Sequence, residues 1–180
     1  MRKLRTIEMQ RISAEAFRAA EKMPLVVVLD DVRSMHNVGS VFRTCDAFRV
    51  ENIFLCGITA CPPHREIHKT ALGAEDSVSW QYFESALSAV NKLRADGYIV
   101  YGVEQCEGST KLPFPPSFEL PEKAAIILGN EVKGVHQEVI DRSHGCLEIP
   151  QHGTKHSMNV SVAAGIAIWE FARRLQLRTV

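Results

Sequence analysis

Short apolar runs recur along the chain and predict the strands of a sheet. The clearest is PLVVVLDD, from Pro24 to Asp31, which is apolar without a break until two acids end it. A run of this kind is typical of a strand that is buried on both faces in a parallel sheet. Shorter apolar runs predict five further strands, at residues 51–57, 80–83, 98–104, 124–131 and 145–150.

Between these runs, apolar residues recur every three or four positions, as they do in amphipathic helices. This spacing predicts helical segments at residues 6–21, 38–48, 64–72, 84–95, 136–142 and 159–175. The first helix is expected to pack on the body of the protein or on a partner through four residues: Ile7, Ile12, Ala16 and Phe17. Residues 111–123 contain four prolines and are predicted to form a loop.

The alternation of strands and helices predicts an α/β fold with a mostly parallel six-stranded sheet and flanking helices. With 180 residues, the chain suits a single domain, residues 1–180, in which residues 1–22 form an N-terminal helical extension. Ligands of such folds bind at the carboxyl ends of the strands. That rule draws attention to the loops after the first, fourth, fifth and sixth predicted strands.

Composition narrows the class of protein. Hydrophobic residues make up 46% of the chain, charged residues make up 23%, and the formal net charge is zero. The overall charge therefore does not mark a nucleic-acid-binding protein, and any basic surface must be local, as in the N-terminal run MRKLRTIEMQR. Because no apolar stretch reaches membrane-spanning length and no signal core is present, we expect a cytoplasmic protein without a membrane partner.

Cysteines and histidines add little to this picture. Five cysteines, an odd number without a repeated CxxC spacing, favour free thiols in a reducing cytoplasm. His64 and His68 lie four positions apart in HREIH. The glutamate does not directly follow the first histidine, as the zinc-protease motif requires, so we expect no metal site.

The segment NVGSVFRT, residues 37–44, predicts a helix with a glycine in its first turn. Asn37 is a predicted helix cap, and Gly39 lies on the same face as Arg43, one turn later. Alanine would favour the helix by roughly 1 kcal/mol over glycine at that position. The segment alone leaves two interpretations of Arg43 open. Either another molecule or chain segment approaches it past Gly39, or it is a solvated surface arginine, which is the simpler interpretation.

Two further loops are rich in glycine and small polar residues. Residues 128–135, LGNEVKGV, are compatible with a tight turn whose amides face a ligand, but they match no nucleotide-phosphate motif. Residues 149–165 lead into a helix that is apolar nearly all round and is therefore predicted to be buried. Either Ser157 or Asn159 alone would cap that helix, so the surplus of polar groups favours a binding site.

Taken together, the three loops resemble the SpoU family of RNA ribose 2′-O-methyltransferases, within the class that has a trefoil-knotted fold. The family's first motif, Asn-x-Gly followed by an arginine, matches Asn37, Gly39 and Arg43. Its second motif, GNExxG, matches residues 129–134. Its third motif, IPMxGxxxSLNVS, matches residues 149–161, with a glutamine and a methionine in place of the usual methionine and leucine.

The resemblance implies a deep C-terminal trefoil knot, a homodimer, and S-adenosylmethionine as the methyl donor. It assigns cofactor binding to five residues: Glu104, Leu128, Gly129, Ile149 and Met158. It assigns catalysis to five more: Arg43, Asn37, Glu131, Ser157 and Asn159. Gly39 then becomes clearance for an RNA backbone or a partner chain. Whether Arg43 serves its own subunit or the partner subunit stays open.

The implied substrate is a ribose of tRNA or rRNA. Many rRNA-modifying members carry an extra N-terminal RNA-binding domain for which this chain is too short, which favours tRNA. Basic residues near both ends are candidates for phosphate contacts: Arg2, Lys3, Arg5, Arg11, Arg18, Arg173, Arg174 and Arg178. Solvated helix ends are an equally good interpretation of these residues.

Three rival functions compete with this one. A phosphoacceptor receiver domain would use Asp30 and Asp31, but it also needs an aspartate after the third strand and a lysine after the fifth, which are missing. If these two acids form no site, they are expected to cap a loop or pair with nearby arginines. The second and third rivals keep the fold: an RNA-binding relative without catalysis, and a base methyltransferase.

Overall fold

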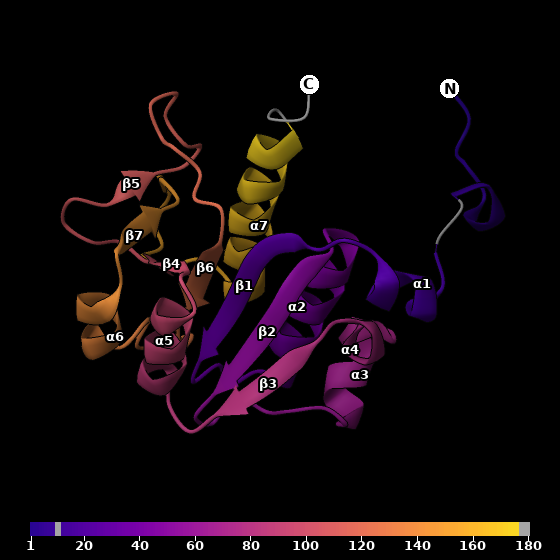
Figure 1. The fold of residues 1–180 in the computed structure, drawn as a ribbon, viewed down its shortest axis with the longest axis horizontal. Helices are drawn as coiled ribbons and strands as arrows, with labels where there is room; N and C mark the ends of the chain where they lie inside the picture. The colour runs from indigo at the N-terminus through magenta and orange to yellow at the C-terminus, as the bar shows by residue number, and fades with distance from the viewer. Residues whose placement is uncertain (10–11, 177–180) are drawn as a thin grey trace.

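The structure, a computed structural model, describes residues 1–9 and 12–176. Its strands are β1 (Met23–Asp30), β2 (Val50–Cys56), β3 (Trp80–Phe83), β4 (Ile99–Val103), β5 (Thr110–Lys111), β6 (Ala124–Leu128) and β7 (Gly145–Glu148). Its helices are the 3-10 helix η1 (Thr6–Met9) and the α-helices α1 (Ala14–Ala19), α2 (Met35–Ala47), α3 (Arg65–Ala71), α4 (Ala74–Ser77), α5 (Ala86–Ala95), α6 (Gln137–Arg142) and α7 (Val160–Gln176). Figure 1 shows their arrangement.

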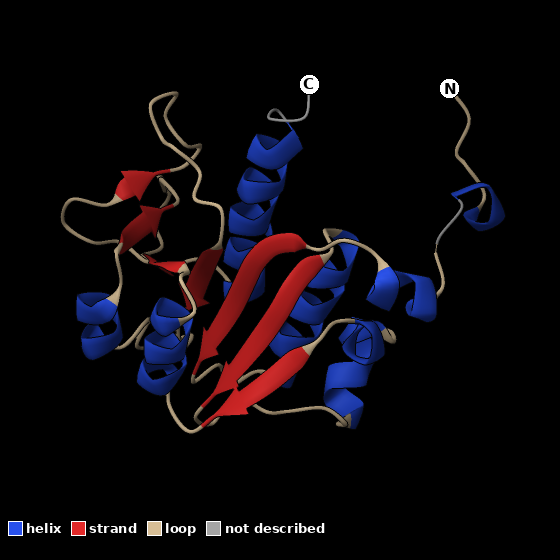
Figure 2. Cartoon of the chain, viewed as in Figure 1, coloured by secondary structure: helices blue, strands red, loops and turns tan. Residues whose placement is uncertain are grey.

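The described strands form one seven-stranded sheet, in the order β3-β2-β1-β6-β4-β7-β5 (Figure 2). Every pair of neighbouring strands in it is parallel, which confirms the predicted α/β class. The predicted count of six strands is wrong, because β5 adds a seventh at the edge beside β7. A strand of two residues has no hydrophobic run by which the sequence could reveal it, and Lys111 falls inside the predicted proline-rich loop.

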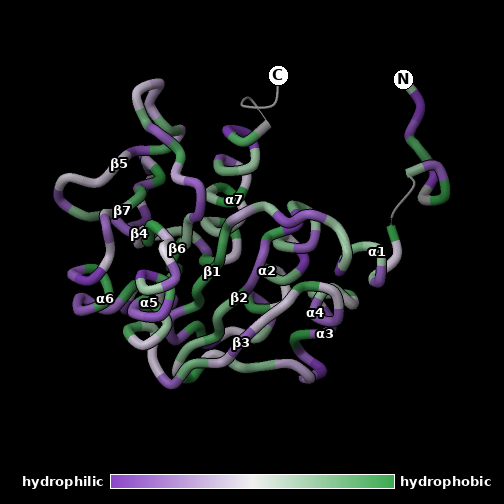
Figure 3. Tube along the Cα trace, viewed as in Figure 1, coloured by the Kyte–Doolittle hydropathy of each residue, from purple (hydrophilic) through white to green (hydrophobic). Residues whose placement is uncertain are grey.

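Both faces of the sheet are covered, and the core is therefore split into two layers. In β1, Leu25, Val27 and Leu29 point into the layer beneath α2, α3 and α7. Val26 and Val28, which alternate with them, point into the layer beneath α5 and α6. This arrangement explains the unbroken apolar run, which is green along β1 in Figure 3, because a strand covered on both sides needs apolar residues at every position.

Helices α2 and α3 pack closely at Gly39, which is buried. A Cβ at Gly39 would lie 2.2 Å from the Thr70 hydroxyl oxygen and 2.3 Å from the Ile67 carbonyl oxygen. The expectation that Gly39 gives clearance for an RNA backbone or a partner chain is therefore wrong. The glycine is needed because α3 of the same chain occupies that space.

The predicted helix 6–21 is also wrong as a single element. It is replaced by η1 and by the short helix α1, which starts where the Ser13 hydroxyl accepts a hydrogen bond from the Ala16 amide at 3.1 Å. Ile7 is 88% exposed and Ile12 is 47% exposed, and residues 1–9 extend away from the body in Figure 1. Of the four residues predicted to pack inward, only Phe17 is buried, because α1 is too short to carry a longer stripe.

Helix α7 lies beside α2 and covers part of the sheet, but it is not buried all round as its composition predicts. Its side chains Ala164, Ala167 and Ile168 are buried, whereas Val162 and Trp169 are each 50% exposed. An apolar face of α7 is thus left uncovered in this chain. No helix among the described residues is long and apolar enough to cross a bilayer.

Candidate active site

A pocket of about 350 Å³ lies where β4, β6 and β7 end, at the predicted edge of the sheet. Seven of the ten predicted site residues line it: Glu104, Leu128, Gly129, Glu131, Ile149, Ser157 and Met158. They come from three loops that are far apart in the sequence. Parallel strands end at a common edge, and for this reason the loops that follow them meet.

The wall contributed by residues 129–134 is a tight turn. The Asn130 and Gly134 backbones are joined by two hydrogen bonds, of 3.1 and 2.9 Å. A Cβ at Gly129 would lie 2.1 Å from the Gly134 carbonyl carbon, and Gly134 itself has a φ of 71°, which favours glycine. The glycines of GNEVKG are therefore required by the turn, and they leave its backbone bare toward the pocket.

Glu131 holds the start of α2 against this turn. Its carboxylate accepts hydrogen bonds from the Arg33 and Ser34 amides, both at 3.0 Å, and from the Asn37 side-chain amide at 2.9 Å. Burial on its own would raise the pKa of Glu131. The hydrogen bonds from Arg33, Ser34 and Asn37 outweigh that effect and hold the pKa below its usual value.

Asn37 links the first motif to the third. Its side-chain oxygen accepts a hydrogen bond of 3.1 Å from the Asn159 amide. The prediction that Asn37 caps its helix is wrong, because α2 begins at Met35. Its cap is Ser34, whose hydroxyl accepts a hydrogen bond from the backbone amide of Asn37. The side chain of Asn37 is thereby free to bridge Glu131 and Asn159.

Asn159 has the capping role that was predicted for it or for Ser157. Its side-chain oxygen accepts hydrogen bonds from the Ser161 amide at 2.9 Å and the Ser161 hydroxyl at 2.6 Å. Ser157 is exposed at the mouth of the pocket and forms no such cap. The two polar residues at the start of α7 therefore have different surroundings.

Arg43 stands apart from the other predicted residues. It lies on α2 two turns after Asn37, its side chain is exposed, and it does not line the pocket. Among the described residues it has no hydrogen-bond or ion-pair partner. The structure of one chain therefore brings nine of the ten predicted residues into one network or pocket and leaves Arg43 free on the surface.

The sequence did not single out Gln105 or Asn130, which both help to build the pocket. The Gln105 side-chain amide donates to the His156 carbonyl at 2.7 Å, joining the loops after β4 and β7. The Asn130 side chain donates to the Asp31 carbonyl at 2.8 Å and accepts from the Val132 amide at 2.9 Å. An asparagine that starts a glycine-rich turn is a known signal for such contacts, whereas Gln105 gave no signal.

Glu104, the predicted cofactor residue after β4, also braces the turn. One carboxylate oxygen accepts a hydrogen bond from the Gln105 amide at 2.9 Å, and the other accepts one from the Val135 amide at 3.3 Å. A Cβ at Gly134 would lie 2.3 Å from the second oxygen. Glu104 thus packs directly against the GNEVKG backbone.

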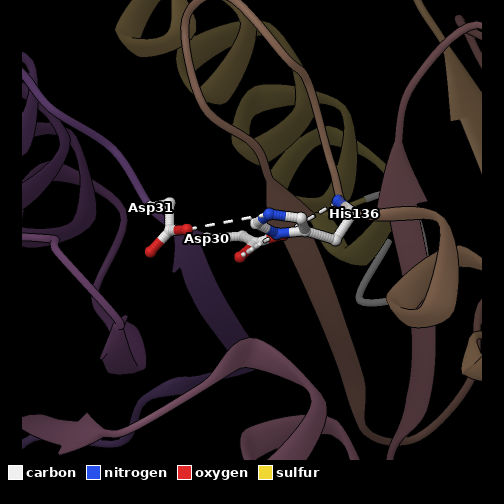
Figure 4. A group of neighbouring side chains, drawn as sticks. All are labelled: Asp30, Asp31 and His136. Carbon is white, nitrogen blue, oxygen red and sulfur yellow. Dashed lines mark hydrogen bonds and ion pairs between the residues drawn. The ribbon is translucent and has the colours of Figure 1, made fainter.

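Asp30 and Asp31 surround His136 at the end of β1 (Figure 4). The His136 Nδ1 atom lies 3.0 Å from both oxygens of buried Asp30, its Nε2 atom lies 3.7 Å from Asp31, and its amide donates to Asp30 at 3.0 Å. Asp31 also accepts a hydrogen bond from the Ile58 amide at 2.9 Å, so the expected capping of a loop is confirmed, and the acids pair with a histidine rather than with arginines. Because His136 directly follows the turn at residues 129–135, the contact anchors that turn to β1.

Comparison with known proteins places these loops in a family. The model of the SpoU rRNA Methylase family matches residues 24–169. The mouse tRNA (guanosine(18)-2′-O)-methyltransferase TARBP1 is 31% identical over 152 residues, which are 83% of this chain and 9% of that protein.

Two solved structures have the same fold. An AdoMet-bound rRNA methyltransferase from Sinorhizobium meliloti aligns with a TM-score of 0.75 and 25% identity, over 88% of this chain and 60% of that one. A structure described for 2-OH methylation of C/U34 on tRNA aligns with a TM-score of 0.73 and 25% identity, over 86% of this chain and 97% of that one. The chain spans between 9% and 69% of the first three curated relatives that it matches.

Proposed function

Because this chain belongs to the SpoU rRNA Methylase family, we propose that it transfers a methyl group from S-adenosylmethionine to a ribose 2′-hydroxyl of RNA. One observation carries the proposal. The second- and third-motif loops line one pocket, and hydrogen bonds join Glu131 of the second motif to Asn37 of the first and through it to Asn159 of the third.

The pocket suits S-adenosylmethionine in size and in lining. Its volume of about 350 Å³ lies in the range of small-molecule sites. Leu128, Ile149 and Met158 offer apolar surface for an adenine ring, and the bare turn at Gly129 offers backbone groups for the adenosine. Glu104 supplies a carboxylate beside that turn. The cofactor, when bound, supplies an electrophilic methyl group.

The remaining predicted residues would hold the ribose in line with that methyl group, which is a problem of orientation. An arginine guanidinium stays protonated in proteins, so Arg43 serves poorly as a base. We assign Arg43 to positioning a substrate phosphate and stabilising the forming alkoxide, with the proton leaving late or through water. Glu131 and Asn37 brace this region, while Ser157 and Asn159 order the loop and the reacting oxygen.

A homodimer would complete the site. The exposed side chains Val162 and Trp169 on α7 give an apolar face that a second copy would cover. Helix α7 packs on α2, and the Trp169 ring contacts Phe48 just after α2, with ring centroids 5.8 Å apart. Arg43, exposed on α2, would then lie near the interface, and we propose that it acts in the partner subunit's site.

We also propose the knot and the domain boundaries that the family resemblance implies. The sheet order supports a deep C-terminal knot, because β6 lies between β1 and β4, and β7 lies beyond β4. Residues 1–180 would form one methyltransferase domain, with residues 1–22 as an extension.

We propose tRNA rather than rRNA as the substrate class. The support is that one solved structure of the same fold is described for methylation on tRNA and that the mouse relative is a tRNA methyltransferase. Mapping 2′-O-methyl sites in RNA from a deletion strain and its parent would identify the nucleotide. Loss of a methyl group from rRNA alone would contradict the tRNA assignment.

The Arg43→Ala variant tests the chemistry. Removing one charge that stabilises the transition state is expected to lower turnover on the native RNA by roughly 100- to 1,000-fold, with binding of S-adenosylmethionine unchanged by calorimetry. Arg94→Ala, on the opposite face of the sheet, is the matched control and should keep full turnover. Full turnover by Arg43→Ala would contradict the role in catalysis that we assign to Arg43.

Mixed dimers test which subunit Arg43 serves. Met158→Arg is designed to fill the cofactor pocket and inactivate its own site. Mixing it with Arg43→Ala should restore about a quarter of wild-type turnover, because half of randomly formed dimers are mixed and each has one complete site. If Arg43 acts in its own subunit, the mixture stays inactive.

A further inference from the structure

Two cysteines meet beside the segment that lines the pocket at Val103, Glu104 and Gln105. The Sγ atoms of Cys106, in the loop after β4, and Cys146, in β7, lie 2.6 Å apart. Cys106 is half-buried and Cys146 is 8% exposed. The neighbouring strand residue opposite Cys146 is Gly102, where an added Cβ would lie 3.6 Å from the sulfur, an ordinary contact, and 2.5 Å from the Ile140 Cδ1 atom.

The segment that carries Cys106 also forms hydrogen bonds to the two other loops of the pocket. Gln105 donates to the His156 carbonyl of the third-motif loop, and Glu104 accepts from Val135 at the end of the second-motif turn. Any constraint on Cys106 therefore acts, through the two preceding residues, on both of the other pocket loops.

We propose that Cys106 and Cys146 are the site of a reversible disulfide that fixes this wall of the pocket. The oxidant is a low-molecular-weight disulfide of the glutathione class. The bond requires only a small approach of the two sulfurs, because disulfide-bonded sulfurs are about 2.05 Å apart. That the disulfide regulates cofactor binding rests on the proposed function, whereas its formation does not.

The exchange runs in two balanced steps. The more accessible Cys106 thiolate attacks the small disulfide, forming a mixed disulfide and releasing one small thiol. Cys146 then attacks the Cys106 sulfur, loses its proton to water or the leaving thiolate, and releases the second small thiol. The protein gives up two electrons and two protons in total, and one small disulfide becomes two small thiols.

The surroundings of the cysteines favour this order of steps. Burial first, and then the hydrogen bond and charge of Cys106, raise the pKa of Cys146 to about 12. Cys146 is thus the weaker initial nucleophile. Once Cys106 is part of a mixed disulfide its thiolate is gone, and only the burial and the nearby Glu104 still oppose ionisation of Cys146.

Two measurable effects follow. The bond links residues 40 positions apart in the sequence, so it constrains the unfolded chain and should raise the melting temperature by roughly 5–10 °C. It also holds Glu104 and Gln105 in place before the cofactor arrives. Less ordering is then needed on binding, and we expect the Kd for S-adenosylmethionine to fall by roughly three- to tenfold.

The test uses the full chain equilibrated in buffers of reduced and oxidised glutathione. After alkylation of free thiols, peptide mass spectrometry without reductant should show a Cys106–Cys146 cross-link, and the melting temperature without cofactor should rise with it. Cys106→Ser and Cys146→Ser should each abolish both changes. Cys61→Ser is the matched control, because Cys61 is also half-buried and its thiol donates a hydrogen bond to the Thr59 carbonyl, and it should keep both changes.

Two results would overturn the proposal: Cys106 that carries glutathione without cross-linking, or a cross-link whose formation leaves the Kd for S-adenosylmethionine unchanged. The Cys106→Ser variant keeps the test decisive if the buried Cys146→Ser protein fails to fold. A protein that forms the cross-link normally on oxidation, but that binds no S-adenosylmethionine in its reduced state, would refute the proposed function. The proposed disulfide would still be supported.

Discussion

At the scale of single residues, the polar groups of the site satisfy one another. Asn159 donates to Asn37, Asn37 donates to Glu131, and Glu131 also accepts from two backbone amides ahead of α2. Each link joins a different segment of the chain. Substitution at any of these positions is therefore expected to change stability as well as activity, and both need to be measured.

Glu131→Gln tests this network through its pH dependence. The NH2 group of the new glutamine would face the donors of Arg33, Ser34 or Asn37 and could not accept a hydrogen bond from them. We therefore expect a loss of about 1–2 kcal/mol in the free energy of unfolding at pH 7. A carboxyl whose pKa is lowered in the folded state stabilises the protein above its unfolded pKa, about 4.3, and the effect is lost as pH falls through the lower folded value.

Urea denaturation of both proteins at pH 7 and at pH 3 measures this difference. The gap between wild type and Glu131→Gln should narrow at the acid pH, because below about pH 4.3 the unfolded wild-type chain takes up a proton on Glu131 that the folded protein resists. A gap of constant size would show that the charge of Glu131 is not what holds Asn37 and the start of α2.

The location of a site residue was predicted correctly where that residue ends or follows a predicted strand. Leu128 ends β6, Gly129 follows it, and Ile149 follows β7, so sheet geometry alone brings them together. Gln105 was missed because its contact, a carbonyl 51 positions away, depends on how two loops fold against each other. No local pattern encodes such a contact.

At the scale of elements, α2 shows how one helix serves two neighbours. Val38, Val41 and Phe42 are fully buried against the sheet, as the apolar pattern predicts. Gly39 is buried as well, but on the side that meets α3. Arg43 remains exposed, although it lies one turn after Gly39. The shared face is therefore partly core and partly surface.

Gly39→Ala tests the close approach of α2 and α3. Alanine favours an isolated helix by roughly 1 kcal/mol, but the added methyl would collide with Thr70 and the Ile67 carbonyl, and overpacking typically costs about 1–3 kcal/mol. We expect a net loss of stability of up to about 2 kcal/mol in thermal or urea unfolding.

Gly145→Ala is the control for that variant, because its Cβ would lie 3.8 Å from Tyr101, an ordinary contact. Its stability should stay within about 0.5 kcal/mol of wild type. A Gly39→Ala protein that is more stable than wild type would mean that α3 yields easily and that the glycine is not required for packing.

At the scale of the whole molecule, the exposed apolar face of α7 bears on whether the protein is a monomer or a dimer. It is apolar enough to be buried all round, yet Val162 and Trp169 stay half exposed while the opposite face packs on the sheet and α2. We propose that a second copy covers this apolar surface. A second copy covering α7 would also bring a second Arg43 near the pocket region.

Trp169→Lys tests that interface by analytical ultracentrifugation. Wild type is expected to sediment as a dimer and Trp169→Lys as a folded monomer, because burying an unpaired charge opposes association. Ile58→Lys is the matched control, since Ile58 is 65% exposed elsewhere on the surface, and it should remain dimeric. A Trp169→Lys protein that still dimerises would exclude this face.

The sequence by itself determined the α/β class and the central strands, because hydrophobic period is a local property, and its resemblance to the family's motifs identified seven of the residues that line the pocket. Only the tertiary structure decided what Gly39 faces, which residue caps α2, and that the N-terminal helix is broken. It also decided that β5 exists, that α7 keeps an open face, and that Cys106 meets Cys146. These features depend on contacts between segments distant in sequence, for which a local pattern carries no information.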